Sequence, residues 1–194
     1  MIKHHIDRLE KLLPLKVGED CQEEYETYLK LEGAGEEQFA VLEMKYGVIL
    51  PDDFKEFYRY KNGSGYHFHI LYPSYGEGAV SPFYLLSLEE IDKLKAYFCS
   101  EDILLSEHFE EDEIARLDKR IRPYYGNRKW LPIAQLAGGS LYLMLDFDPS
   151  EHGKAGQVIA FVHDPDFIYY AADSFAELLD ISNKNLEDWE EIDY

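Results

Sequence analysis

Apolar residues recur at helical spacing through the first third of the chain. Three groups of positions, three or four residues apart, predict three amphipathic helices. The groups are Ile2, Ile6, Leu9, Leu12 and Leu13; then Tyr25, Tyr28 and Leu29; then Phe39, Leu42 and Tyr46. Gly18 and the Gly-Ala-Gly at residues 33–35 separate these groups, so we place the breaks between the helices there.

A fourth helix is predicted inside the stretch YGVILPDDFKEFYRYKNGSG, residues 46–65. Pro51 suits the first helical position, where no backbone N–H is needed, and the two aspartates after it complement the helix dipole. Asn62-Gly63 supplies the left-handed residue that ends a helix. The side chains expected on the buried face are Phe54, Phe57, Tyr58 and, through its aliphatic stem, Lys61. Each residue thus fits a capped amphipathic helix packed on a core.

From Tyr66 onward the pattern changes to alternation and short apolar runs, which are typical of strands. We expect strands at residues 66–72 and 83–86, then a helix from a capping box at Ser87 to about Phe98. Residues 110–122 have acids in the first turn and bases toward the end, which predicts another helix. Its buried stripe would be Ile114, Leu117 and Ile121.

The second half of the chain has the pattern of a sheet. The run LYLMLDF, residues 141–147, is apolar at successive positions, so we expect a central strand with both faces covered. Residues 157–162 are its expected antiparallel neighbour, residues 167–171 form a short last strand, and Ser174 opens a C-terminal helix. The grouping predicts an α+β fold, with a central, mainly antiparallel sheet and N-terminal, inserted and C-terminal helices.

Length and cysteine content favour a single domain in a reducing compartment. A chain of 194 residues buries roughly 70% of its extended surface, so its core needs no disulfides. Cys21 and Cys99 are expected as two free thiols. The N-terminus lacks the apolar core of a signal peptide, and no apolar run reaches the ~18 residues of a membrane span. We therefore expect a cytoplasmic protein.

Motifs for cofactors and metals are weak. The glycine pairs at residues 33–35 and 63–65 lack a third glycine and a following lysine, so we expect no nucleotide cofactor. His67 and His69 alternate on one face of the predicted strand and could supply two metal ligands. Without a third ligand at a suitable spacing, two surface or half-buried histidines are the better interpretation, and we expect no metal.

Paired carboxylates are the best candidate for catalysis. Asp146 and Asp148 lie two residues apart near the end of the central strand, hence on one face, where they could hold a cation or act as acid and base. The alternative is ordinary polarity at a strand end, with Asp148 starting a turn. No nucleophile has a recognisable setting, so the motifs do not support an enzyme.

The net charge of −20 is concentrated in three segments. Residues 19–37 and 101–113 each carry −7, residues 177–194 carry −6, and the rest of the chain is balanced. Such a chain repels nucleic acid and anionic membranes, so we expect neither as a partner and instead expect a basic protein. The alternative is that the acidic faces only keep the protein in solution.

Taken in order, several stretches resemble the SUKH superfamily, which includes the Smi/Knr cell-wall-assembly regulators and many bacterial immunity proteins. The first is Glu43-x-x-Tyr46-Gly47-x-x-Leu50-Pro51-x-Asp53-Phe54-x-x-Phe57, closed by Asn62-Gly63. The later ones are Trp130-Leu131-Pro132-Ile133-Ala134, then Gly139 and Leu145-Asp146, then Gly156-Gln157-Val158, then Asp173-Ser174-Phe175. The resemblance extends from about Phe39 to Leu179.

The resemblance implies an α+β domain with a central antiparallel sheet that acts by binding another protein, and it supplies no catalytic set. Compared with the minimal domain, this chain has a helical N-terminal extension, residues 1–38, and an acidic helical insert, residues 99–122. We expect the whole chain, residues 1–194, to be a single domain of this kind.

Charge and resemblance together predict a bacterial, cytosolic immunity protein that binds a basic toxin domain, for instance a nuclease, and blocks its active site. The alternative is a regulatory or scaffold binding domain of the Smi/Knr kind, whose acidity serves solubility. A third and weaker alternative is a cation-dependent enzyme that uses Asp146 and Asp148.

The partner is expected to contact the acidic segment at residues 101–113. Four consecutive acids at a helix start exceed what the helix dipole requires, although drift toward acidity is the alternative. The segment at residues 19–37 spreads its charge along helices, and the one at residues 177–194 lies at a chain end that can fray. The predicted contact residues are Glu101, Asp102, Glu107, Glu110, Glu111, Asp112 and Glu113.

Overall fold

A curled sheet of six strands forms the centre of the protein, and the computed structural model describes residues 2–136, 138–164 and 166–192. In order across the sheet, the strands are β1 (His69–Leu71), β4 (Phe83–Leu85), β7 (Trp130–Gln135), β8 (Leu141–Asp146), β9 (Gln157–Val162) and β10 (Phe167–Ala172). Every neighbouring pair is antiparallel. The predicted α+β class with a central antiparallel sheet is therefore confirmed.

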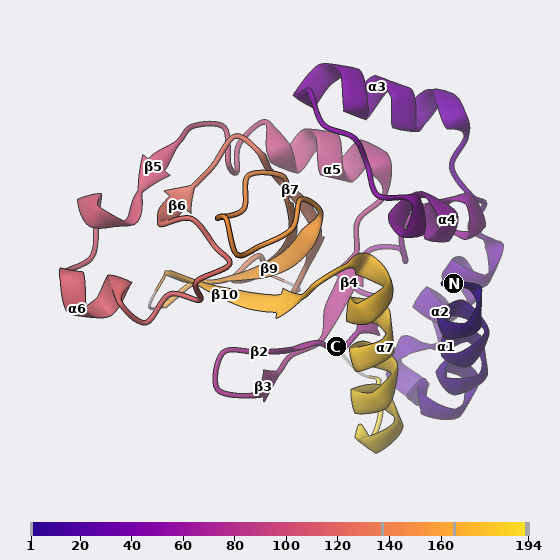
Figure 1. Cartoon of the computed structure of the whole chain (residues 1–194). Helices are drawn as coiled ribbons and strands as arrows, with labels where there is room; N and C mark the ends of the chain where they lie inside the picture. The colour runs from indigo at the N-terminus through magenta and orange to yellow at the C-terminus, as the bar shows by residue number, and fades with distance from the viewer. Residues whose placement is uncertain (1, 137, 165, 193–194) are drawn as a thin grey trace.

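The longer helices pack at one end of this sheet and along one edge of the molecule (Figure 1). They are α1 (Lys3–Lys16), α2 (Gln22–Lys30), α3 (Glu36–Tyr46), α4 (Asp52–Tyr60), α5 (Leu88–Lys95) and α7 (Phe175–Asp188). The breaks predicted at Gly18 and at residues 33–35 fall where α1 and α2 end. Both predicted capping serines are confirmed, since Ser87 and Ser174 accept the backbone N–H of the residue three positions later. None of the described helices is long and apolar enough to cross a membrane.

Helix α4 packs its predicted face into the core, but its ends differ from the prediction. The fully buried side chains are Phe54, Phe57 and Tyr58. Pro51 is the residue before the first helical position, and the helix ends at Tyr60, ahead of Asn62-Gly63. Lys61 is also buried. Its ammonium donates to two carbonyl oxygens at the end of α2, at 3.0 and 2.9 Å, and these bonds compensate for the loss of water. Gly63 has a φ of +89°, and a Cβ there would lie 2.7 Å from the backbone N of Ser87.

The strand predicted over residues 66–72 is shorter than expected. Residues 64–68 form a turn instead, in which the hydroxyl of Ser64 donates to the carbonyl of Phe68 at 2.7 Å. His67 has a φ of +62°, which no strand residue adopts. Only His69 of the two histidines lies in β1, and it is buried, so the prediction that both share one strand face was wrong.

Strand β8 is covered on both faces, as its apolar run predicts. Leu143 and Leu145 belong to the main hydrophobic core, which also holds the buried side chains of α1, α3, α4 and α7. Met144, between them, belongs to a second cluster on the opposite face. The chain between α5 and β7 covers this second face with Cys99, Ile121 and partly buried aromatic side chains. Both cysteines are buried, and neither forms a disulfide.

This connecting segment is not the long helix predicted for residues 110–122. It contains a two-stranded ribbon, β5 (Ile103–Leu104) with β6 (Tyr124–Gly126), and a single helical turn, α6 (Glu111–Ile114). The α-helix ends at Ile114, and the next residues continue in i→i+3 hydrogen bonds, from Arg116 to Glu113 at 3.1 Å and from Leu117 to Ile114 at 2.9 Å. Beyond them, the Asp118 carboxylate accepts the backbone N–H of Arg120 at 2.9 Å in a separate turn. After this turn, the Ile121 side chain is buried in the second cluster.

The C-terminal segment is held to the N-terminal helix. The backbone N–H of Ile192 donates to the carbonyl of Lys16 at 2.7 Å, and Ile192 is fully buried beside Val17. Residues up to 192 are therefore anchored, which corrects the expectation that this acidic run frays; its last two residues lie outside the described ones. A small hairpin, β2 (Ser74–Tyr75) with β3 (Ala79–Val80), projects below the sheet in Figure 1.

Candidate partner-binding surface

The acidic segment, residues 101–113, lies at the opposite end of the molecule from α1 and α2 (Figure 1). Its backbone runs from β5 through a short 3-10 turn, Leu105–Glu107, into α6. Leu105 is fully buried, and its N–H donates to the carbonyl of Pro123 at 3.0 Å. The segment is therefore a protrusion with a fixed base.

Three of the seven predicted acids hold this protrusion together. Asp102 accepts two hydrogen bonds from the Arg128 guanidinium, at 3.0 and 2.8 Å, and these bonds lower the pKa of its carboxyl. Glu107 accepts the backbone N–H of Leu104 at 3.0 Å, and Glu113 accepts that of Glu110 at 3.0 Å. Both contacts have the form of the carboxylate half of a capping box. These three acids thus have local structural roles.

The other four acids have no such role. Glu101, Glu110, Glu111 and Asp112 are exposed, and no hydrogen bond or ion pair involves their carboxylates within the part of the chain that the structure describes. Three of the four are consecutive at the start of α6. Exposed like charges at this spacing repel one another, so the tip of the protrusion carries a local negative potential that the fold does not neutralise.

A buried carboxylate lies near the base of the protrusion, at the end of β8. Asp146 is fully buried and accepts three hydrogen bonds: from Trp130 Nε1 at 3.0 Å, Gln157 Nε2 at 2.9 Å and the backbone N–H of Asp148 at 2.8 Å. Burial raises the pKa of its carboxyl to about 6, an effect that the three donors only partly offset.

The second carboxylate of the predicted pair faces different partners. Asp148 accepts a hydrogen bond from Asn127 at 3.0 Å and forms an ion pair with Arg122 at 3.2 Å. Protein donors thus occupy both carboxylates. Within the described ranges, no group of three or more His, Cys, Asp or Glu side chains is placed to hold a metal ion. Asp148 therefore links the connecting segment to the sheet, while Asp146 joins β7, β8 and β9.

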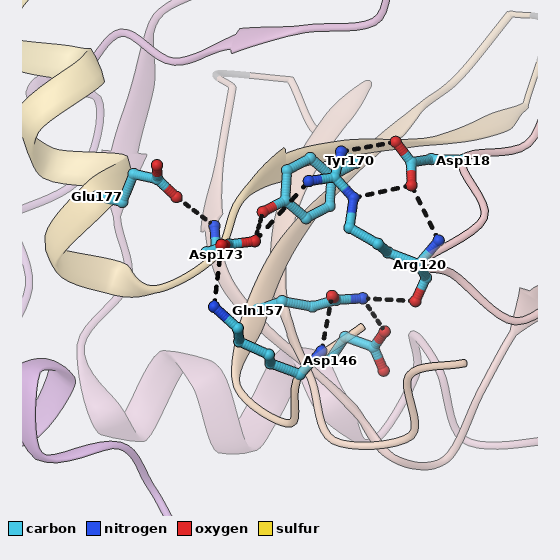
Figure 2. Close-up of polar contacts among 8 residues, drawn as sticks. Asp118, Arg120, Asp146, Gln157, Tyr170, Asp173 and Glu177 are labelled. Carbon is cyan, nitrogen blue, oxygen red and sulfur yellow. Dashed lines mark hydrogen bonds and ion pairs between the residues drawn. The ribbon is translucent and has the colours of Figure 1, made fainter. Parts of the chain in front are cut away.

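A network of polar side chains extends this link to the edge strand β10 (Figure 2). The Arg120 guanidinium lies 3.2 Å from the centre of the Tyr170 ring and pairs with Asp118 at 2.7 Å. The Tyr170 hydroxyl donates to Asp173, and Gln157 donates to the Arg120 carbonyl at 3.0 Å. Sequence reasoning missed this network, because Arg120 and Tyr170 are fifty positions apart and neither belongs to a recognisable motif.

The seven predicted contact acids therefore share one protrusion but divide into two sets. Asp102, Glu107 and Glu113 belong to the scaffold, whereas Glu110, Glu111 and Asp112 give the tip at α6 its exposed negative charge and Glu101 lies just before β5. The buried Asp146 and the network around Arg120 fix the base on which this tip stands.

Comparison with protein families gives one match. A model of the SMI1 / KNR4 family (SUKH-1) matches residues 33–181, which run from the start of α3 into α7 and include the protrusion and Asp146. A comparison with the curated proteins finds no match.

Proposed function

Because this chain belongs to the SMI1 / KNR4 family (SUKH-1), we propose that it is an immunity protein, which binds a cognate toxin and neutralises it without catalysis. Domains of this family are protein-interaction modules, of the immunity or the Smi/Knr kind. A bacterial cytoplasm is the compartment in which such a protein would meet an incoming toxin. We also propose that residues 1–194 act as one domain, with residues 1–38 as an extension and residues 99–122 as an insert.

One observation carries the proposal: four free acids stand on a protrusion whose base is fixed. A toxin that cleaves nucleic acid must be basic where it grips phosphate. A protein with a net charge of −20 attracts such a surface, and an unneutralised acidic tip would orient the encounter.

Co-expression is the first experiment. The C-terminal domain of a large toxin encoded immediately upstream of this gene would be expressed with and without the protein. We expect growth arrest without the protein, rescue with it, and a stable complex on purification. Arrest that persists beside the folded protein, with no complex, would refute the immunity function. If no such toxin gene lies upstream, a regulatory binding domain of the Smi/Knr kind becomes the better explanation.

Charge removal locates the interface. The variant Glu110→Gln, Glu111→Gln, Asp112→Asn removes three free charges from the tip. The matched control is Asp20→Asn, Glu23→Gln, Glu26→Gln, which removes three exposed charges near the opposite end of the molecule. We expect the tip variant to lower the association rate about tenfold at low ionic strength and less at high salt, while the control changes it much less. Equal effects of the two variants would place the interface elsewhere.

A further inference from the structure

A groove between α3 and α5 lies apart from the acidic protrusion. It has a volume of about 320 Å³ and is lined by Glu37, Gln38, Val41, Leu42, Leu88, Glu89 and Asp92. Leu42 and Leu88 are almost fully buried and form its floor. Both leucines also belong to the main hydrophobic core, so the floor of the groove is fixed by the fold.

Hydrogen bonds hold the two helices together at both ends of the groove. The Gln38 amide donates to Glu89 at 2.5 Å, and Lys45 donates to both oxygens of Asp92 at 2.6 and 2.8 Å. The Tyr46 hydroxyl also donates to Asp92, at 2.5 Å. The groove is therefore formed before any partner arrives, which lowers the entropic cost of filling it.

Val41 lines the groove, and an exposed apolar ridge continues from it along α3 to Met44, which lies outside the groove. Val41 is 54% exposed and Met44 is 83% exposed, and their spacing of three residues puts them side by side on the helix surface. Figure 1 shows α3 at the upper edge of the molecule, with α5 and α4 below it. An exposed methionine and valine beside an apolar groove are typical of an adaptable protein-binding surface.

The negative charge at the rim of the groove favours a basic occupant. Glu37 is exposed and forms no ion pair within the described part of the chain, and the side chains that donate to Glu89 are uncharged: Gln38, Asn62 and Ser87. Asp92 is neutralised by Lys45. A second copy of this chain is a poor occupant, because it would bring another −20 charge to an acidic rim. The volume lies at the lower limit of small-molecule sites and suits one side chain.

We propose that this groove is a second docking surface, which takes a protein segment bearing one apolar side chain flanked by lysine or arginine. The apolar side chain fills the space above Leu42 and Leu88, against Val41, and the rest of the segment extends over Met44 beside it on α3. The basic side chains meet Glu37 and Glu89. This site goes beyond the proposed toxin-binding tip and does not depend on it.

A library of random peptides displayed on phage, panned against the whole protein, tests the proposal. We expect recovered peptides to share an apolar residue next to lysine or arginine. The variant Val41→Gln, Met44→Gln should weaken their binding by about tenfold or more. The control Leu15→Gln, Leu29→Gln changes two apolar side chains of 78% and 51% exposure on α1 and α2, and should leave binding within about twofold.

Several results would overturn the proposal. They are recovery of no binding peptide, peptides without basic residues, or equal binding by the two variants. A wild-type protein that dimerises in sedimentation velocity, and becomes monomeric on Val41→Gln, Met44→Gln, would identify a second copy as the occupant and also overturn it. The tip variant at residues 110–112 should bind the peptides as the wild type does, so failure here is distinguishable from failure of the toxin-binding proposal.

Discussion

Replacing Asp146 with asparagine removes one titrating group and leaves a side chain of nearly the same size. In the wild type, the pKa of this carboxyl is about 6 in the folded protein, against 3.8 for an ordinary aspartate. The folded state therefore binds this proton more tightly than the unfolded state does. The contribution of Asp146 to stability is greatest below pH 3.8 and falls as the pH rises through 6.

The size of the effect follows from these two values. Linkage predicts that the contribution of Asp146 to the free energy of unfolding falls by about 2 kcal/mol as the pH rises from 4 to 7.5. Asparagine cannot accept from Gln157 with its amide nitrogen, so Asp146→Asn should cost about 1–3 kcal/mol at pH 4. The gap between wild type and variant should then shrink by about 2 kcal/mol as the pH rises to 7.5.

Urea unfolding at a series of pH values measures this difference. Circular dichroism is the better probe, because the Trp130 indole donates to Asp146 and its fluorescence would report the local change. Other carboxylates, such as Asp102, have lowered pKa values and make stability fall with acid, but they are present in both proteins and cancel in the difference. A gap that stays constant from pH 4 to 7.5 would refute the reasoning. A carboxyl-carbon titration of Asp146 by NMR gives the midpoint directly.

Three further changes should alter the free energy of unfolding, measured by urea denaturation at neutral pH. Lys61→Met keeps the buried stem but leaves two carbonyl oxygens of α2 without a donor, and should cost about 1–3 kcal/mol. Gly63→Ala should cost about 3 kcal/mol or more, because the new methyl would meet the backbone of Ser87. The control Gly65→Ala should cost about 1 kcal/mol, because Gly65 has a similar φ but no atom within 4 Å of the new methyl. Equal costs would contradict the argument from contact. Ser87→Ala and Ser174→Ala should each cost about 1 kcal/mol as lost helix caps, and no loss would show that solvent caps these helices equally well.

The elements that sequence patterns predicted correctly are those governed by local rules. Strand β8 has apolar residues at successive positions because both of its faces are covered, so its central place could be deduced. The buried face of α4 and the caps at Ser87 and Ser174 likewise depend only on neighbouring residues.

The errors arose where a distant or competing contact decides the conformation. Residues 110–122 have good helical periodicity, but the α-helix ends at Ile114, and the chain continues in i→i+3 hydrogen bonds and a turn at Asp118 before Ile121 enters the second cluster. The strand expected from Tyr66 begins only at His69, because the preceding residues turn around Ser64. The free and scaffold acids of the protrusion could not be separated beforehand, since Arg128, the partner of Asp102, lies beyond the segment itself.

The fold constrains the two ends of the protrusion to different degrees. At its base, Ile121 is buried in the second hydrophobic cluster, and Leu105 is fully buried and hydrogen-bonded to Pro123 before β6, so substitutions there would destabilise the region. Its tip, residues 106–113, has no fully buried side chain. The core therefore places few constraints on Glu110, Glu111 and Asp112, whose charge and size can vary at little cost to the fold. Chains that differ only at this tip could present different surfaces on the same scaffold.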